Sequence, residues 1–232
     1  MQLKYYKTIT QQKQDLDYNI MAGSSGPDLI TNGLVLALDA ADKNSYIGSG
    51  TTWRDLSGNG NNATLINTPT YSNNKFYMNG TTQYAEVTSN ISTTRTVDIV
   101  YKLYNPGTGW GPLWRVEDWR ERIFPSTINL IASSVTYYYL NGPDSGTSII
   151  NIVYSYNGTS IKSYKNGVIQ STATMDSNMD TGLYTYRFGN QSGGSTNAYV
   201  EMDLYSVKFY NRQLTDTEVL QNYNATKTRF GL

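Results

Sequence analysis

The sequence predicts an all-β fold, a sandwich or barrel of antiparallel strands, with one short helix near the end of the chain. Three observations indicate this class. The chain of 232 residues contains 21 tyrosines and 20 glycines, a composition that favours strands joined by tight turns. Short segments alternate between apolar and polar residues, and Asn-Gly pairs punctuate them. Strands at short spacing with such turn signals are typical of sandwiches and barrels.

The predicted strands begin at residues 34–38, which are continuously apolar, as expected for a strand covered on both faces. Residues 97–103 and 150–156 alternate apolar with polar side chains, which predicts two half-buried strands. Type I′ hairpin turns, in which both central residues have positive φ, are predicted at three Asn-Gly pairs. These pairs are Asn79-Gly80, Asn157-Gly158 and Asn166-Gly167.

A short helix is predicted at about residues 216–225. Thr215 and Glu218 have the spacing of a capping box, in which each side chain bonds to the backbone N–H of the other residue. Leu214 and Val219 stand on either side of this box as a hydrophobic staple. The helix is therefore expected to start at a fixed point and to pack on the rim of the sandwich.

Residues 1–30 differ from the rest, and we interpret them as an N-terminal arm and linker that precede a β domain at 31–232. Residues 22–27 are rich in Gly and Ser, as in a flexible linker. The arm contains a strand-like segment with Leu3, Tyr5, Tyr6 and Ile9. Such a segment can add a strand to the sheet edge of a neighbouring molecule, so these residues are candidates for assembly. A poorly ordered terminus is the alternative.

The composition excludes several classes of function. The sequence has neither His nor Cys, which removes Ser-His-Asp and thiol catalysis and zinc sites built on these residues. Its 18 basic and 18 acidic residues give no net charge, which argues against nucleic acid as a partner. No apolar stretch is long enough for a membrane-spanning helix, so membrane insertion is not expected.

Several blocks of the sequence resemble LamG-like jelly-roll domains of the concanavalin A-like lectin and glucanase superfamily. The blocks are residues 32–39, 53–65, 76–80, 164–168, 186–190 and 204–215. The versions that look most similar belong to virion proteins of tailed phages. The resemblance implies a two-sheet antiparallel jelly-roll sandwich, here with one short C-terminal helix and an N-terminal arm.

The resemblance also implies a function. We expect a non-enzymatic structural protein located in the virion, which decorates the capsid, neck or tail or acts as an adhesin, with weak glycan binding during host adsorption. Its expected partners are other virion proteins, further copies of itself and host surface polysaccharide. The N-terminus lacks the apolar core of a secretory signal, which agrees with release by lysis and disfavours a cellular adhesion module.

The segment from residue 104 to 125 contains the candidate ligand site, because it gathers three of the four tryptophans among arginines and glycines. Aromatic rings can stack on sugars, and Arg can bond pairs of hydroxyls. The candidates for glycan or partner binding are Trp110, Trp114, Arg115, Trp119, Arg120 and Arg122. Two alternatives stay open: that the tryptophans belong to the core, or that the patch is a protein interface, which also favours Trp and Arg.

A glucanase-like polysaccharide depolymerase is the alternative function. Glycoside hydrolysis uses a pair of carboxylates. Glu201 and Asp203 are two residues apart on a predicted strand and therefore share one face. In the related glucanases a second Glu follows as the acid/base, whereas here that position is Tyr205, a poor proton donor at neutral pH. Catalysis is therefore not expected.

The loop from Asp55 to Asn61 is a candidate metal site. Asp55 and Asn59 offer oxygen ligands of the kind that calcium prefers. The loop has only one carboxylate, and a tight loop held by Asx-turns explains the same residues. No cofactor is expected beyond a calcium ion at this loop.

Overall fold

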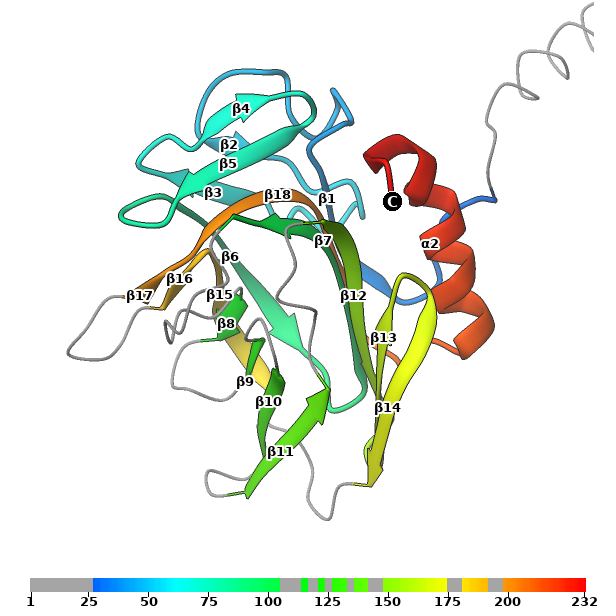
Figure 1. Ribbon diagram of the computed structural model, residues 1–232. Helices are drawn as coiled ribbons and strands as arrows, with labels where there is room; N and C mark the ends of the chain where they lie inside the picture. Colours follow the sequence, from blue (N-terminus) through cyan, green and yellow to red (C-terminus); the bar gives the residue numbers. More distant parts are fainter. Residues whose placement is uncertain are drawn as a thin grey trace, which may run out of the picture.

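The computed structural model describes residues 27–104, 114–116, 121–123, 127–132, 136–141, 148–174, 181–191 and 198–232 (Figure 1). Two groups of predicted site residues lie outside this part of the chain. The first is the arm, with Leu3, Tyr5, Tyr6 and Ile9, and the second comprises Trp110, Trp119 and Arg120.

The described residues form two antiparallel sheets packed face to face, which confirms the predicted all-β sandwich. Sheet I has the order β14-β13-β12-β7-β18-β5-β4, and β1 also pairs with β18. Its strands are β1 (Leu34–Asp39), β4 (Thr70–Ser72), β5 (Lys75–Asn79), β7 (Arg95–Leu103), β12 (Ile149–Tyr156), β13 (Ser160–Lys165), β14 (Val168–Thr174) and β18 (Glu201–Tyr210).

Sheet II has the order β11-β10-β9-β8-β15-β6-β3-β2. Its strands are β2 (Thr52–Trp53), β3 (Ala63–Ile66), β6 (Tyr84–Ile91), β8 (Trp114–Val116), β9 (Glu121–Ile123), β10 (Thr127–Ala132), β11 (Thr136–Asn141) and β15 (Gly182–Phe188). A short separate pair joins β16 (Asn190–Gln191) to β17 (Ala198–Tyr199).

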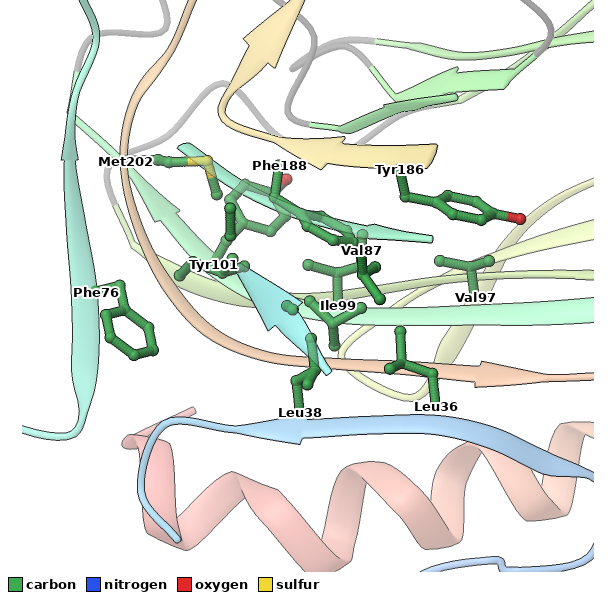
Figure 2. Close-up of a cluster of buried hydrophobic side chains, with 14 of the residues drawn as sticks. Leu36, Leu38, Phe76, Val87, Val97, Ile99, Tyr101, Tyr186, Phe188 and Met202 are labelled. Carbon is green, nitrogen blue, oxygen red and sulfur yellow. The ribbon is translucent and has the colours of Figure 1, made fainter. Parts of the chain in front are cut away.

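The main core fills the space between the sheets. Alternate residues of β7, including Val97 and Ile99, point from sheet I toward Val87, Tyr186 and Phe188 of sheet II (Figure 2). Leu36 and Leu38 of β1 join them, and all seven side chains are buried. The period of two along each strand therefore produces one continuous apolar layer.

β18 changes its inward-facing residues halfway along, because a bulge interrupts its pairing with β7 between Leu204 and Ser206. Before the bulge Met202 and Leu204 belong to the main core, whereas after it Val207 and Phe209 do. The extra residue shifts the alternation by one position. The outer face of sheet I is consequently formed by odd-numbered residues at the start of β18 and by even-numbered residues at its end.

The C-terminal helix α2 spans Asp216–Phe230, which is longer than the predicted 216–225. The capping box of Thr215 and Glu218 is present as predicted, and Gly231 ends the helix in the left-handed conformation. The additional turn forms because Thr226 and Phe230 have their own buried sites against the sheet. Neither α2 nor any other helix of the described residues is long and apolar enough to cross a membrane.

Along β7 and β12 the outer face of sheet I is covered rather than solvated, so the prediction of half-buried strands at β7 and β12 is wrong. Val219 of α2 and Ile30, which lies just before β1, pack on Val153, Tyr164 and Tyr210, which project from that face. The polar residues of the same face are buried with them: Thr96, Asp98, Asn151, Ser155 and Lys208.

The three Asn-Gly pairs behave differently. Asn166 and Gly167, between β13 and β14, both have positive φ (51° and 76°), as a type I′ turn requires. At residues 157–158, between β12 and β13, only the glycine has positive φ. The prediction at residues 79–80 is wrong, since this pair connects β5 of sheet I to β6 of sheet II.

Candidate functional site

A group of charged and aromatic side chains lies on the outer face of sheet I, beyond the area that α2 covers. Its members lie on or next to three adjacent strands: Lys75 and Tyr77 on β5, Glu201 and Asp203 on β18, and Tyr104 directly after the end of β7. We call these five residues the Asp203 cluster. As predicted, Glu201 and Asp203 share one face, since Met202 between them enters the core.

Asp203 is the buried centre of this cluster. Its side chain is fully buried, and its Oδ2 atom pairs with the Lys75 ammonium and accepts a hydrogen bond of 2.8 Å from the Tyr104 hydroxyl. Lys75 also donates to the Tyr104 oxygen at 3.3 Å. Three strands are therefore tied together by one carboxylate. A buried charge of this kind persists only when it is paired and hydrogen-bonded.

The aromatic residues form the outer part of the cluster. The Tyr77 hydroxyl donates to Oε1 of Glu201 at 2.7 Å, and the Tyr77 and Tyr104 rings meet edge to face with centroids 5.7 Å apart. The ammonium of Lys102 lies 4.8 Å from the Tyr104 centroid, within cation–π range. Tyr104 is 38% exposed. The cluster thus presents an aromatic surface whose neighbouring polar groups are already fixed in position.

Local contacts shift the protonation of these groups. The pKa of Tyr77 is raised by its hydrogen bond to the Glu201 carboxylate and by burial. For Tyr104, burial and the hydrogen bond to Asp203 raise the pKa. Burial opposes the charge of Lys75, but its hydrogen bonds to Asp203 and Tyr104 outweigh this effect and raise its pKa. Over the neutral range the tyrosines therefore act as neutral donors and Lys75 as a cation.

The geometry offers a hydrolytic mechanism little support. A substrate cannot reach the fully buried Asp203, and Glu201 is engaged by Tyr77. Burial and the charge of Asp203 raise the pKa of Tyr205 to about 12, which makes it a still weaker acid. Sequence reasoning missed Lys75, Tyr77 and Tyr104 as partners of the two carboxylates. The alternation of Lys75 and Tyr77 around Phe76 was the available signal, but it did not reveal which strand lies beside β18.

On sheet II, the register places the predicted arginines side by side. Arg187 of β15 pairs with Arg115 of β8, which pairs in turn with Arg122 of β9. On the other side Arg187 is opposite Glu86 of β6 and bonds to its carboxylate at 3.1 Å. Trp114 occupies a different row, opposite the buried Phe188. The backbone therefore brings Arg115 and Arg122 together and separates them by one position from Trp114.

The Asp55 loop is held by its own hydrogen bonds. Oδ1 of Asp55 accepts from the N–H groups of Ala37 and Ser57, both at 2.8 Å. Oδ2 accepts from the Ser57 hydroxyl at 2.7 Å and from the Asn61 N–H at 3.0 Å. Asn59 donates its side-chain amide to Ser57 and to the start of β1. Among the described residues no group of three or more acidic side chains could hold a metal, and calcium at Asp55 and Asn59 stays a prediction.

No protein-family model matches the sequence, and no curated protein matches it. Solved structures with a similar fold do exist. The binding domain of botulinum neurotoxin serotype D matches with a TM-score of 0.65 and 12% identity, covering 84% of this chain and 52% of the toxin chain. The chain thus spans about half the length of that domain.

Two further structures share the fold. Trypanosoma rangeli sialidase in complex with sialic acid matches with a TM-score of 0.59 and 12% identity, over 94% of this chain and 39% of the sialidase. Domain 4 of AbnA, an extracellular GH43 arabinanase from Geobacillus stearothermophilus in complex with arabinotriose, matches with a TM-score of 0.60 and 14% identity. That match covers 82% of this chain and 98% of the other. At these identities the likeness concerns the fold.

Proposed function

We propose that this protein is a non-enzymatic carbohydrate-binding domain and that the Asp203 cluster contributes a sugar contact. The observation that carries the proposal is the partly exposed Tyr104 ring, which is fixed by Asp203, Lys75 and Tyr77 before any ligand arrives. An aromatic surface with a few preorganised polar groups suits a sugar, whose one face is apolar and whose edges carry hydroxyls. Arg115 and Arg122 on sheet II are a second proposed contact, as glycan or partner ligands.

The finer part of the proposal concerns where the domain works. We infer a structural protein on the surface of a tailed-phage virion, at the capsid, neck or tail, that assists adsorption to host polysaccharide. The similarity of six sequence blocks to LamG-like jelly-roll domains of such virions supports this role. The strand-like segment with Leu3, Tyr5, Tyr6 and Ile9 is the proposed contact to other virion proteins or to further copies of the chain.

Binding is tested by titrating the full chain with arabinotriose, sialyllactose and laminarin oligosaccharides in a calorimeter. Tyr104→Ala should weaken the binding of whichever sugar is recognised by about two- to twelvefold, since loss of one aromatic contact removes about 0.5–1.5 kcal/mol. Tyr223→Ala is the matched control, because Tyr223 also has a lysine, Lys227, 5.7 Å from its ring but lies on α2. Equal weakening by both changes would contradict a site at Tyr104.

The rival depolymerase is tested separately. Incubation with laminarin and with surface polysaccharide should release no reducing ends, and Glu201→Gln should change nothing. Release that disappears in Glu201→Gln would establish the enzyme instead. The virion role requires that the protein migrate with purified particles in a density gradient, and its absence from them would remove that part of the proposal.

A further inference from the structure

Three polar side chains meet in the layer between sheet I and α2, away from the Asp203 cluster. Lys208 projects from β18, Asp98 from β7 and Asn151 from β12, so that the carboxylate stands on the strand between the other two. Their residues are 4%, 2% and 1% exposed. Val153 and Tyr210 belong to the same covered layer, and so do the buried polar side chains of Asn222 and Thr226 of α2.

The two nitrogen-bearing groups approach the same carboxylate. Lys208 Nζ lies 3.4 Å from Oδ2 of Asp98, and Asn151 donates its side-chain amide to Oδ1 at 2.6 Å. Within these three side chains, two atoms have no hydrogen-bond partner among the described residues: Lys208 Nζ and Asn151 Oδ1. Buried polar atoms are almost always satisfied, so two orphans around one carboxylate call for an explanation.

An ordinary buried ion pair explains only part of this arrangement. Taking a lysine and a carboxylate out of water costs several kcal/mol, and good hydrogen bonds must offset that cost. Here Lys208 lies close to the charge of Asp98 but makes no hydrogen bond among the described residues. The side-chain oxygen of Asn151 also has no hydrogen-bond donor among them. A nucleophile, an acyl group and a proton carrier are thus assembled in one water-poor site.

We propose that Lys208 and Asn151 form a spontaneous amide cross-link, with Asp98 as the acid/base. One proton passes from the Lys208 ammonium to Asp98, since a water-poor site favours the neutral pair over two separated charges. The Asn151 amide turns so that its oxygen accepts from the protonated carboxyl, which polarises Cγ. The lysine amine then attacks Cγ, as activated lysines do.

The remaining steps release ammonia. Asp98 carries a proton from Nζ to the Asn151 amide nitrogen, the Cγ–Nδ2 bond breaks, and one ammonia molecule leaves. A lysine amine and an asparagine amide thereby become one secondary amide and ammonia, so no oxidant, metal or co-reactant is needed. The new bond joins β18 to β12 across β7. It also replaces the buried Lys208 charge by a neutral N–H.

The cross-link is tested by mass spectrometry of the folded full-length protein. The intact mass should be lower than the sequence mass by one ammonia molecule. Because an Asn-Gly pair can also lose ammonia, the decisive measurement is the tryptic digest, in which a branched peptide should connect residue 208 to residue 151. Protein that has never folded, recovered from inclusion bodies and dissolved directly in urea, should give the linear peptides, because the reaction needs the folded site.

Asp98→Asn is the control, since it keeps the shape of the side chain but removes the proton carrier. Its digest should contain only linear peptides, with folding verified by circular dichroism. If this variant does not fold, the wild-type digest alone decides the question. Linear peptides alone in folded wild-type protein would overturn the proposal. A branch between residues 208 and 98 with loss of water would also overturn it, by making Asp98 the acyl group.

Discussion

The two ends of β18 carry the same chemistry in different surroundings. After the bulge, Lys208 pairs with Asp98 beneath α2, and the two side chains are 4% and 2% exposed. Before the bulge, Lys75 pairs with Asp203 beyond the helix, and the two side chains are 19% and 0% exposed. The covered pair is isolated from solvent and hydrogen-bonded to the buried Asn151, whereas the open pair is connected to tyrosines that reach the surface.

This contrast shows that the covering layer, rather than the pair itself, determines what a lysine and a carboxylate can do. Water can reach Lys75 and share in its hydrogen bonding, so that pair serves to hold Tyr104 in place. Lys208 lies beneath α2, where solvent has little access to its ammonium group. Its charge must therefore be neutralised within the protein, either by an ion pair or by a reaction that removes the charge. Four of the ion pairs that the described residues form, ranging from buried to exposed, allow this idea to be tested.

Lys208→Met should have the largest effect on stability. It leaves Asp98 buried without a cation, and breaking a buried pair typically costs about 3–5 kcal/mol of unfolding free energy. Denaturant unfolding measures the loss. The double change Lys208→Met with Asp98→Leu should recover the part of the loss that comes from the unpaired charge, because both charges are then absent, but not the part that comes from the missing cross-link. A loss below about 1 kcal/mol for Lys208→Met alone would show that the covered pair is not isolated as the contrast requires.

Lys75→Met should cost less, about 1–3 kcal/mol, the range for leaving one buried acceptor incompletely satisfied. Asp203 keeps its hydrogen bond from Tyr104, and the space left by the ammonium borders solvent. The same unfolding experiment measures the difference from Lys208→Met. Equal losses of unfolding free energy at the two sites would mean that burial beneath α2 does not determine how much an ion pair contributes to stability.

Arg212 and Glu218 form a third, more exposed pair at the start of α2, with side chains 26% and 25% exposed. Glu218→Gln should cost about 1 kcal/mol at neutral pH, since it weakens both this pair and the capping box. The hydrogen bond from Arg212 lowers the pKa of Glu218 from 4.5 to about 2. Wild-type stability should therefore fall between pH 4.5 and 2 as the carboxylate is protonated. The variant should lack that part of the pH dependence.

Lys162 and Asp216 form the most exposed of the four pairs, at 31% and 59%. Lys162→Met should change the unfolding free energy by less than about 0.5 kcal/mol, because exposed pairs contribute little and Tyr164 still donates to Asp216. Thermal unfolding in low and high salt checks this. A loss of unfolding free energy as large as that of Lys75→Met would contradict the expectation that the contribution of an ion pair falls as its exposure rises.

Structural features that depend only on residues close together in the chain could be predicted from the sequence. The apolar run of β1, the capping box of α2 and the shared face of Glu201 and Asp203 were all read correctly. Each is fixed by local periodicity or by a spacing of a few residues. The bulge in β18 was not predicted, since it appears only when the strand is aligned with β7.

Errors arose where a distant segment decides the outcome. Asp98 was expected at a solvated face, but α2 covers it from the other end of the chain. Asn79-Gly80 has the composition of a hairpin turn, yet its flanking strands pair in different sheets. The partners of Asp203 come from β5 and β7, and nothing near Asp203 in the sequence indicates them.

The central position of β18 also sets the order in which the protein can fold during synthesis. β18 lies between β7 on one side and β1 and β5 on the other, although it follows all three in the chain by about a hundred residues or more. Until residue 210 has left the ribosome, sheet I lacks the strand that joins β7 to β1 and β5, and these early strands have unpaired edges. Folding must therefore await late residues, as expected for long-range β pairing, and the nascent chain is exposed to wrong pairings for most of its synthesis.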